Sequence, residues 1–378
     1  MLYLIFNFIV LTPFLKIGFN NSFVECLEYL VILYLITYIF ANFKRVKVTS
    51  IFLHYLLILI LLLNLSYTQY NLGDAINEIR QLLLPFLFYY CVQFSDRYNF
   101  SYFLPKIALL ICYIMGTIQF LLPNLVRGYY LTFSDPYIVK TNFVVFSQYN
   151  RILGIYNDPN VFGYFLVMIL AIKIASTRKK TWLSYVLIFI DFLFILLSQS
   201  RWCILISVVL LIFYFVQMNK FSKVRFAVIS IILLISLIFL YPNIVNIIIT
   251  RFNKNISGDT NFTDPRFVHW AYYINDLRSV IPHLLFGKGL GATGMGNNYI
   301  IMENSYLDIM YKLGLIGVCV YYINIGILFI YKYKSKLYIV PLVAFCAGSI
   351  MADLHRIPSI TIILFSFYSI NKKIKNNE

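Results

Sequence analysis

Long apolar runs separated by short polar connections dominate the chain. About twelve runs predict helices, at residues 1–19, 27–43, 50–68, 80–94, 103–123, 160–175, 182–198, 200–218, 225–246, 306–331, 337–352 and 357–370. Most approach the roughly 20 residues that a helix needs to cross a bilayer, and they lack the alternation of a membrane β-strand. We therefore predict an all-α polytopic membrane protein, with residues 1–378 forming a single integral membrane domain.

Composition agrees with this class. Hydrophobic residues make up 61% of the chain and charged residues 12%, which is too little polar surface for a soluble globule. The net charge of +16 lies in short clusters between the apolar runs and not in a basic domain, so no nucleic-acid partner is expected. The six cysteines occur singly and are predicted to be packing residues. The first run lacks a basic start and a cleavage site, which predicts a retained helix.

The Lys/Arg clusters predict the orientation. They lie at 44–47, 178–180, 220–225, 332–336 and 372–375, all on one side of the predicted bundle. By the positive-inside rule this side is cytoplasmic, together with both termini. The two longest connections, 124–159 and 247–305, are then extracytoplasmic. The second, between predicted helices 9 and 10, is expected to act as a lid over a functional site.

On this topology two thirds of the arginines lie outside or at the outer boundary, whereas the lysines gather on the inner side. The outer arginines are Arg80, Arg127, Arg151, Arg201, Arg251, Arg266, Arg278 and Arg356. The positive-inside rule treats the two residues alike and does not explain their separation. A guanidinium grips phosphate with two parallel hydrogen bonds, so some outer arginines are interpreted as anion ligands. The alternative is pairing with outer acids such as Asp74, Glu78, Asp158, Asp264, Asp276 and Asp353. Arg201 is the sharpest case, because a charge buried in its tight hairpin needs a partner or a ligand.

Four stretches carry the remaining polar signals. They are "NRILGIYNDPNVFGYF" (150–165), "SQSRW" (198–202), "DPRFVHWAYYINDLRSVIPHLLFGKGLGATG" (264–294) and "ENSYLDIMYKLGLIG" (303–317). Together and in this order they resemble the bacterial O-antigen polymerase and O-antigen ligase superfamily of polytopic inner-membrane glycosyltransferases. The resemblance covers about 150–320 well, and the first half only through its hydropathy and "IRQLLLP" at 79–85.

The resemblance implies a set of site residues. Those expected to bind a substrate pyrophosphate are Arg80, Arg151, Arg201, Arg266 and Arg278; those expected to contact substrate are Asp158, Asn160, His269 and Trp270; and those expected to carry catalysis are Glu303, Asn304 and Arg201. For His269 and Trp270, packing of an amphipathic helix onto the membrane surface is the alternative to stacking on a sugar. Asp191, inside a predicted span, has no partner evident from sequence.

The last motif favours one branch of the superfamily. In the ligases it usually begins with His, whereas Glu303 stands at that position here, followed by Asn304, Gly314 and Gly317 at the expected spacing. A carboxylate can take the proton of an acceptor sugar hydroxyl, and a helix cap is the alternative role. The two glycines are expected to let membrane helices approach closely. The glycine run at 287–296 lacks the features of a nucleotide loop and is expected to be a flexible turn.

The resemblance implies a polymerase for O-antigen or another surface polysaccharide, such as a capsule, in the bacterial inner membrane. It would join undecaprenyl-pyrophosphate-linked repeat units, with a flippase and a chain-length regulator as further partners. No cofactor is implied, and no metal, because the outer segments contain neither an Asp-x-Asp pair nor a His cluster. The alternatives are a glycan ligase with a different acceptor and a lipid-linked oligosaccharide flippase.

Overall fold

The computed structural model describes residues 1–18, 21–42, 48–67, 71–95, 104–122, 151–156, 158–176, 181–240, 265–292, 302–330 and 336–370. In these ranges every regular element is a helix, which confirms the all-α prediction. The long α-helices are α1 (Leu2–Gly18), α2 (Asn21–Ala41), α3 (Val48–Tyr67), α4 (Leu72–Phe94), α5 (Lys106–Leu121), α8 (Pro159–Ser176), α9 (Trp182–Ser198), α10 (Arg201–Val216), α11 (Lys220–Leu240), α13 (Pro265–Arg278), α15 (Ser305–Ile330) and α17 (Pro358–Ile370). Shorter elements are α14 (Ile281–Phe286), η3 (Lys336–Ile339), α16 (Val340–Gly348) and η4 (Leu354–Arg356).

All the apolar runs predicted as helices overlap a helix of the structure. The largest difference is α4, which begins at Leu72 and not at 80, because the Asn71 side chain accepts a hydrogen bond from the Gly73 N–H and caps an earlier first turn. Three described segments are long and apolar enough to cross a membrane: Ser22–Ala41, Pro159–Ser176 and Ser305–Leu328. The crossing of a membrane by the other helices, and the count of about 12, stay predictions.

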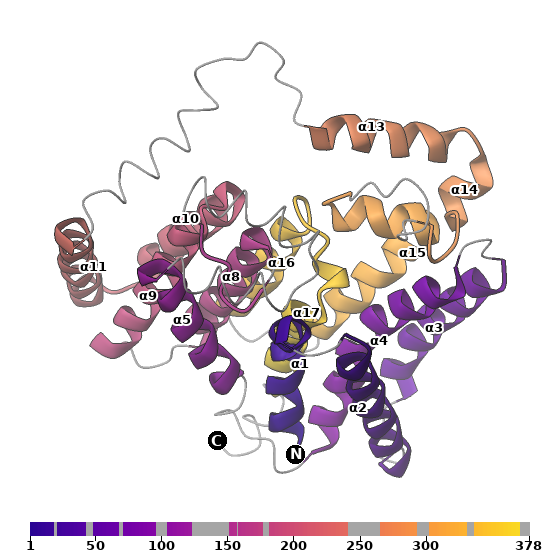
Figure 1. Cartoon of the computed structure of the whole chain (residues 1–378), viewed down its shortest axis with the longest axis horizontal. Coiled ribbons are helices and arrows are strands. Elements are labelled where there is room, and N and C mark those ends of the chain that lie inside the picture. The colour runs from indigo at the N-terminus through magenta and orange to yellow at the C-terminus, as the bar shows by residue number, and fades with distance from the viewer. Residues whose placement is uncertain are drawn as a thin grey trace.

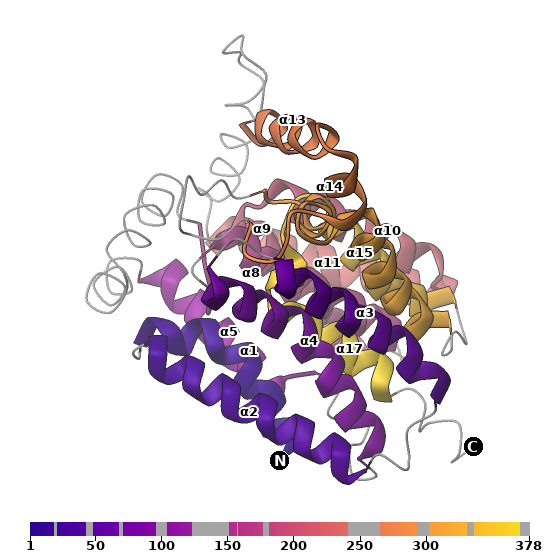
Figure 2. The same cartoon turned by 90° about the vertical axis from the view of Figure 1, so that its right-hand side faces the viewer.

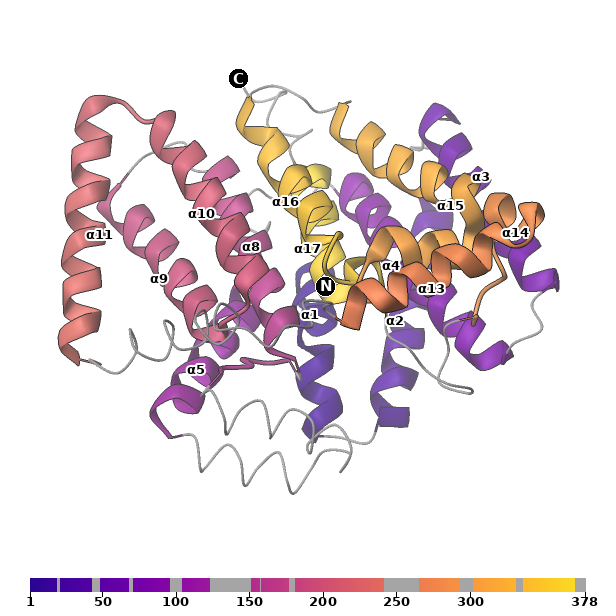
Figure 3. The same ribbon diagram turned by 90° about the horizontal axis from the view of Figure 1, so that it is seen from above.

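Helices α8 and α17 form the centre of the bundle. Figure 3 shows α5, α9, α10 and α11 on one side and α2, α3, α4 and α15 on the other, with α1, α16 and α17 between them. Helix α17 contacts α1, α4, α8 and α16. A helix that is apolar all round must be buried on every side, and nearly all side chains of α8 and α17 are. Outer helices such as α2, α3 and α10 instead expose many Leu, Ile and Val side chains, as expected of lipid-facing surfaces.

Part of the predicted lid is helical. Helices α13 and α14 lie above the bundle in Figures 1 and 2, away from the amino terminus, and lead into α15. Tyr273 and Leu277 of α13 are buried against Met302 and Tyr311, in a small apolar cluster separate from the main core. The predictions for 124–150, for 247–264 and for most of the Lys/Arg clusters lie outside the described residues.

Helix α15 is broken at Gly314, where φ is 70°. The break turns the Tyr311 and Lys312 carbonyls outward, where they accept hydrogen bonds from the Lys288 and Gly289 N–H groups at 2.8 and 3.0 Å. A Cβ at Gly314 would lie 2.1 Å from the Leu285 carbonyl oxygen, so only glycine fits this approach. The close approach expected at Gly314 is therefore made by the lid.

Two smaller expectations concern Gly317 and Asp191. The nearest atoms to a Cβ placed on Gly317 belong to Leu313 of the same helix, and the expected approach of another helix at Gly317 stays a prediction. Asp191 has a partner: its Oδ2 lies 2.7 Å from Lys173 Nζ of α8, and its Oδ1 accepts a hydrogen bond from the Tyr113 hydroxyl of α5. These two contacts join three helices and explain how the Asp191 carboxylate is stabilised inside the bundle.

Candidate functional site

The predicted site residues gather where helices begin. Asp158 and Asn160 lie at the start of α8, Arg201 at the start of α10, Arg266 at the start of α13, and Glu303 and Asn304 directly before α15. The first N–H groups of a helix have no partner within it, and the helix dipole is positive at this end. Helix starts therefore favour anionic ligands, in addition to the charges of the arginines.

Arg151 fastens the start of α8 to the turn between α9 and α10. It is buried, and it donates from Nε to the Ser198 carbonyl oxygen at 2.8 Å and from Nη2 to Asn160 Oδ1 at 2.8 Å. Both acceptors are neutral, so they fix the direction of the guanidinium without adding negative charge. Arg201, the first residue of α10, is exposed, so the expectation of a buried charge in this hairpin is wrong.

The Asp158 carboxylate is influenced by two of the arginines, Arg151 and Arg266. Its Oδ1 accepts a hydrogen bond from the Asn160 N–H at 2.6 Å. Burial raises the pKa of Asp158 above its usual range, and the opposing effects of the N–H groups and of Arg151 and Arg266 are smaller. Because the charge of Arg266 acts on Asp158, the start of α13 lies near the start of α8.

Glu303 and Asn304 have separate roles at the start of α15. The Glu303 carboxylate pairs with Arg266, with Oε2 and Nε 2.5 Å apart. Glu303 also has a positive φ of 48°, which a side chain other than glycine seldom adopts. Asn304 Oδ1 accepts a hydrogen bond from the Leu307 N–H at 3.1 Å, so the capping role belongs to Asn304 and not to Glu303.

Sequence reasoning missed Tyr164. This side chain is buried on α8, one turn after Asn160, and packs close to Gly348. The charges of Arg266, Glu303 and Asp158 act on it, which makes Tyr164 a further candidate for the site. Its spacing from Asn160 in the stretch 150–165 was the available signal, because residues four apart share one face of a helix.

Trp270 fastens the lid to the segment before α15. Its Nε1 donates to the Met302 carbonyl oxygen at 2.6 Å, and its ring packs edge-on against Phe267. These contacts favour a packing role for Trp270, although the surface that it contacts is the segment before α15. His269 is half-buried beside it.

Arg80 and Arg278 are not brought to this site. Arg80 of α4 pairs with Glu28 of α2 at 2.5 Å and lies over the Tyr29 ring. Arg278 is exposed at the last residue of α13. At 1.5 Å per residue it lies about 18 Å along the helix from Arg266, which is too far to share one pyrophosphate.

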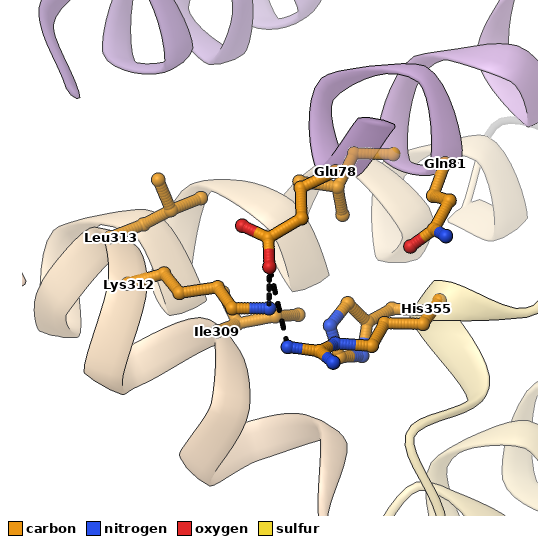
Figure 4. Close-up of a pocket in the computed structure, with 8 residues that line it drawn as sticks. Glu78, Gln81, Ile309, Lys312, Leu313 and His355 are labelled. Carbon is orange, nitrogen blue, oxygen red and sulfur yellow. Dashed lines mark hydrogen bonds and ion pairs between the residues drawn. The ribbon is translucent and has the colours of Figure 1, made fainter. Parts of the chain in front are cut away.

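A second group of charges, which sequence reasoning did not assemble, lies between α4, α15 and η4. We call it the buried network: Glu78, Asp308, Lys312, His355 and Arg356. Figure 4 shows Glu78 reaching from α4 toward Lys312 of α15, with His355 of η4 beside them. Lys312 Nζ lies 2.7 Å from Glu78 Oε1 and 2.6 Å from Asp308 Oδ2. The network borders a cavity of about 10 Å³, enough for about one water molecule.

Asp308 is the centre of the network. Arg356 grips it with two hydrogen bonds, from Nε at 2.9 Å and from Nη2 at 2.8 Å, and His355 Nε2 lies 2.7 Å from Oδ2. Asp308 is 1% exposed, so its charge is compensated almost entirely by these partners. Burial and then the charge of Asp308 raise the pKa of the neighbouring Asp353.

The described part of the chain contains no group of three or more His, Cys, Asp or Glu side chains arranged to hold a metal ion. The six cysteines are free thiols.

The fold and these sites define a membrane protein of the helical class, with a charged site at the starts of four helices. A curated protein of Salmonella muenchen, named O-antigen polymerase, is 25% identical to the chain over 257 residues, which is 63% of each protein. This match confirms the resemblance to O-antigen polymerases, and the chain covers less than two thirds of that relative's length. No family model matches the chain. No solved structure matches it.

Proposed function

We propose that the protein is a polysaccharide polymerase that joins undecaprenyl-pyrophosphate-linked repeat units of an O-antigen or related surface polysaccharide. The observation that carries the proposal is the pairing of Glu303 with Arg266 beside Asp158. It places a carboxylate that can accept a proton next to guanidinium groups that can hold phosphate. The resemblance to an O-antigen polymerase supports the same activity.

The proposed reaction transfers a glycan between two lipid-linked substrates. A hydroxyl of the acceptor sugar attacks the anomeric carbon of the donor glycan, and Glu303 takes the hydroxyl proton. The bond from that carbon to the pyrophosphate oxygen breaks, and undecaprenyl pyrophosphate leaves with the electron pair. Arg151, Arg201 and Arg266 stabilise the negative charge of the leaving group, each contributing about 3 kcal/mol to the lowering of the barrier. No metal ion is required in this scheme.

The resting structure indicates how the substrate engages the site. The Arg266 and Glu303 side chains are 32% and 38% exposed, and such pairs are held weakly because water screens them. A pyrophosphate can replace Glu303 on Arg266 and leave the carboxylate free to act as a base. Asp158, Asn160 and Tyr164 line the same region and would position the sugars. Asn304 orients the acceptor through its side-chain NH₂, since its oxygen caps α15.

The proposed place of reaction is the outer face of the bacterial inner membrane. The starts of α8, α10 and α15 and the lid helices would face outward, and both termini the cytoplasm. Figure 1, where the lid helices and the amino terminus lie on opposite sides, supports this orientation. A flippase that delivers the repeat units and a chain-length regulator are the proposed partners.

Deletion of the gene tests this function. The surface glycan of the deletion strain, run on a gel, should show single repeat units on the core in place of a ladder, and the wild-type gene should restore the ladder. A glycan absent altogether would favour a ligase or a flippase. An unchanged ladder would refute all three activities.

A further inference from the structure

Glu78 connects the lid to the bundle. Its Oε2 accepts a hydrogen bond from the Gly291 N–H at 2.8 Å, and its Oε1 pairs with Lys312 and, at 3.3 Å, with Arg356 Nη2. The carboxylate therefore contacts the turn at residues 287–291, helix α15 and η4 at once. The turn expected to be flexible is docked, because its Lys288 and Gly289 N–H groups also bond to α15 carbonyls.

The other end of the network reaches the candidate site. Arg356 and His355 of η4 hold Asp308, and η4 follows the turn at residues 349–353. This turn holds the start of α15: Asp353 Oδ1 accepts from the Asn304 N–H at 2.8 Å, and the Ser349 carbonyl accepts from the Ser305 N–H at 2.8 Å. A continuous chain of contacts thus joins Gly291 of the lid to the residues beside Glu303.

We propose that Glu78 is a positioning residue, which makes the orientation of Glu303 and Asn304 depend on the docking of the 287–291 turn. The importance of that orientation rests on the proposed function, whereas the docking contact does not. The lid would thereby align the catalytic end of α15 when it closes over its lipid-linked substrates.

The physical basis is the cost of leaving buried polar groups without partners. When the turn undocks, the Tyr311 and Lys312 carbonyls lose their donors, and Glu78 loses the Gly291 N–H. The contacts of Glu78 with Lys312 of α15 and Arg356 of η4 must then change. Because η4 follows the turn that holds the start of α15, the position of that start changes with them. Such an arrangement favours two discrete states, docked and undocked, over a gradual change.

Thiol labelling tests the docking contact directly. Ala292→Cys places a reporter in the docked turn of the full-length protein, which is purified in nanodiscs and treated with a maleimide. In this background Glu78→Gln should speed labelling of the reporter by about tenfold or more. The neutral amide removes the charge that strengthens the hydrogen bond from the Gly291 N–H and that pairs with Lys312. The matched control is Asp74→Asn, one turn earlier on α4, which should leave the labelling rate unchanged. Mass spectrometry measures the labelling of each cysteine. Labelling of exposed Cys26 shows that the reagent is active, and absence of labelling at buried Cys203 shows that the protein is folded.

Polymerisation in cells tests the coupling. Per molecule of protein in the membrane, Glu78→Gln should reduce glycan chain extension by about tenfold or more, and Asp74→Asn should not. Unchanged labelling in the Glu78→Gln protein would overturn the docking contact. Faster labelling with a normal glycan ladder would overturn the coupling.

A second variant covers the case in which Glu78→Gln does not reach the membrane. Glu78→Asp keeps the charge for Lys312 but is one methylene shorter, so it should insert normally and still label faster than wild type. Labelling at the wild-type rate would overturn the proposal. If deletion of the gene leaves the surface glycan unchanged, the proposed function fails, while the labelling result still decides whether the lid is docked through Glu78.

Discussion

Glu303 and Asp308 lie little more than one turn apart on the same chain segment, and both pair with arginine, yet their surroundings differ. The Glu303–Arg266 pair is about one third exposed, and Arg151 nearby donates to the Ser198 carbonyl and to Asn160 and acts on the Asp158 carboxylate. Asp308 is enclosed by Lys312, His355 and Arg356, and is nearly inaccessible. The first region has charges that a ligand can recruit, whereas in the second each carboxylate is committed to several cations.

The difference shows why the presence of an arginine on the predicted outer side does not by itself identify a ligand site. Arg356 and Arg80 are on the predicted outer side like Arg151 and Arg266, but they pair with buried carboxylates, so binding an anion would require breaking those pairs. The partners of an arginine, and their exposure to water, therefore separate stabilising arginines from candidates for phosphate binding.

The largest effect on folding is expected from Asp308→Asn. The substitution leaves the buried Lys312 and the partly buried Arg356 with one carboxylate fewer, which typically costs about 3 to 5 kcal/mol, on the order of a protein's whole stability. Thermal unfolding of the purified protein and its level in membranes measure the loss. Glu25→Gln, at an exposed acid 3.6 Å from Lys16, is the control and should change neither. A stable Asp308→Asn protein would contradict the distinction between the two regions.

Glu303→Gln should have the opposite pattern. It keeps the shape of the side chain but cannot take a proton, so polymerisation should fall by about 10² to 10⁴ while the unfolding temperature stays unchanged. Unpolymerised lipid-linked repeats should accumulate at a normal protein level. Glu303→His should keep part of the activity, since related ligases have His at the matching position. A normal glycan ladder from the Gln variant would show that Glu303 is not the base.

Sequence reasoning succeeded where the signal is local. A run of apolar residues predicts a helix without reference to any other segment, so the bundle was predictable, including the buried α8. The choice of Asp158, Arg266 and Glu303 as site residues came from the resemblance and not from their local pattern. The exposure of Arg201 could not be predicted, because the burial of a hairpin depends on which distant segments pack against it.

The buried network was beyond local reasoning, because its contacts join residues as far apart as Glu78 and Arg356. Two signals were nevertheless present. Lys312 interrupts an apolar run, and a charge inside a predicted span needs a partner. Asp308 precedes it by four residues, the spacing at which opposite charges meet on a helix. The break at Gly314 left no comparable signal, since glycine in an apolar helix usually marks close packing.

Trp270→Phe should have the smallest effect and sharpens the comparison, because it removes one neutral hydrogen bond from the site region and leaves every charge in place. The lost bond, from Nε1 to the Met302 carbonyl, should cost about 1 kcal/mol of lid docking and lower polymerisation by about fivefold.

Trp270→Leu separates packing from sugar stacking. If the hydrogen bond accounts for the role of Trp270, the Phe and Leu variants polymerise equally, since both lack the N–H. If the ring stacks on a sugar, Phe retains activity that Leu loses. Chain length in the Leu variant then depends more strongly on substrate supply, because weaker sugar binding raises the substrate concentration that the reaction needs. Equal activities would assign Trp270 to the lid contact.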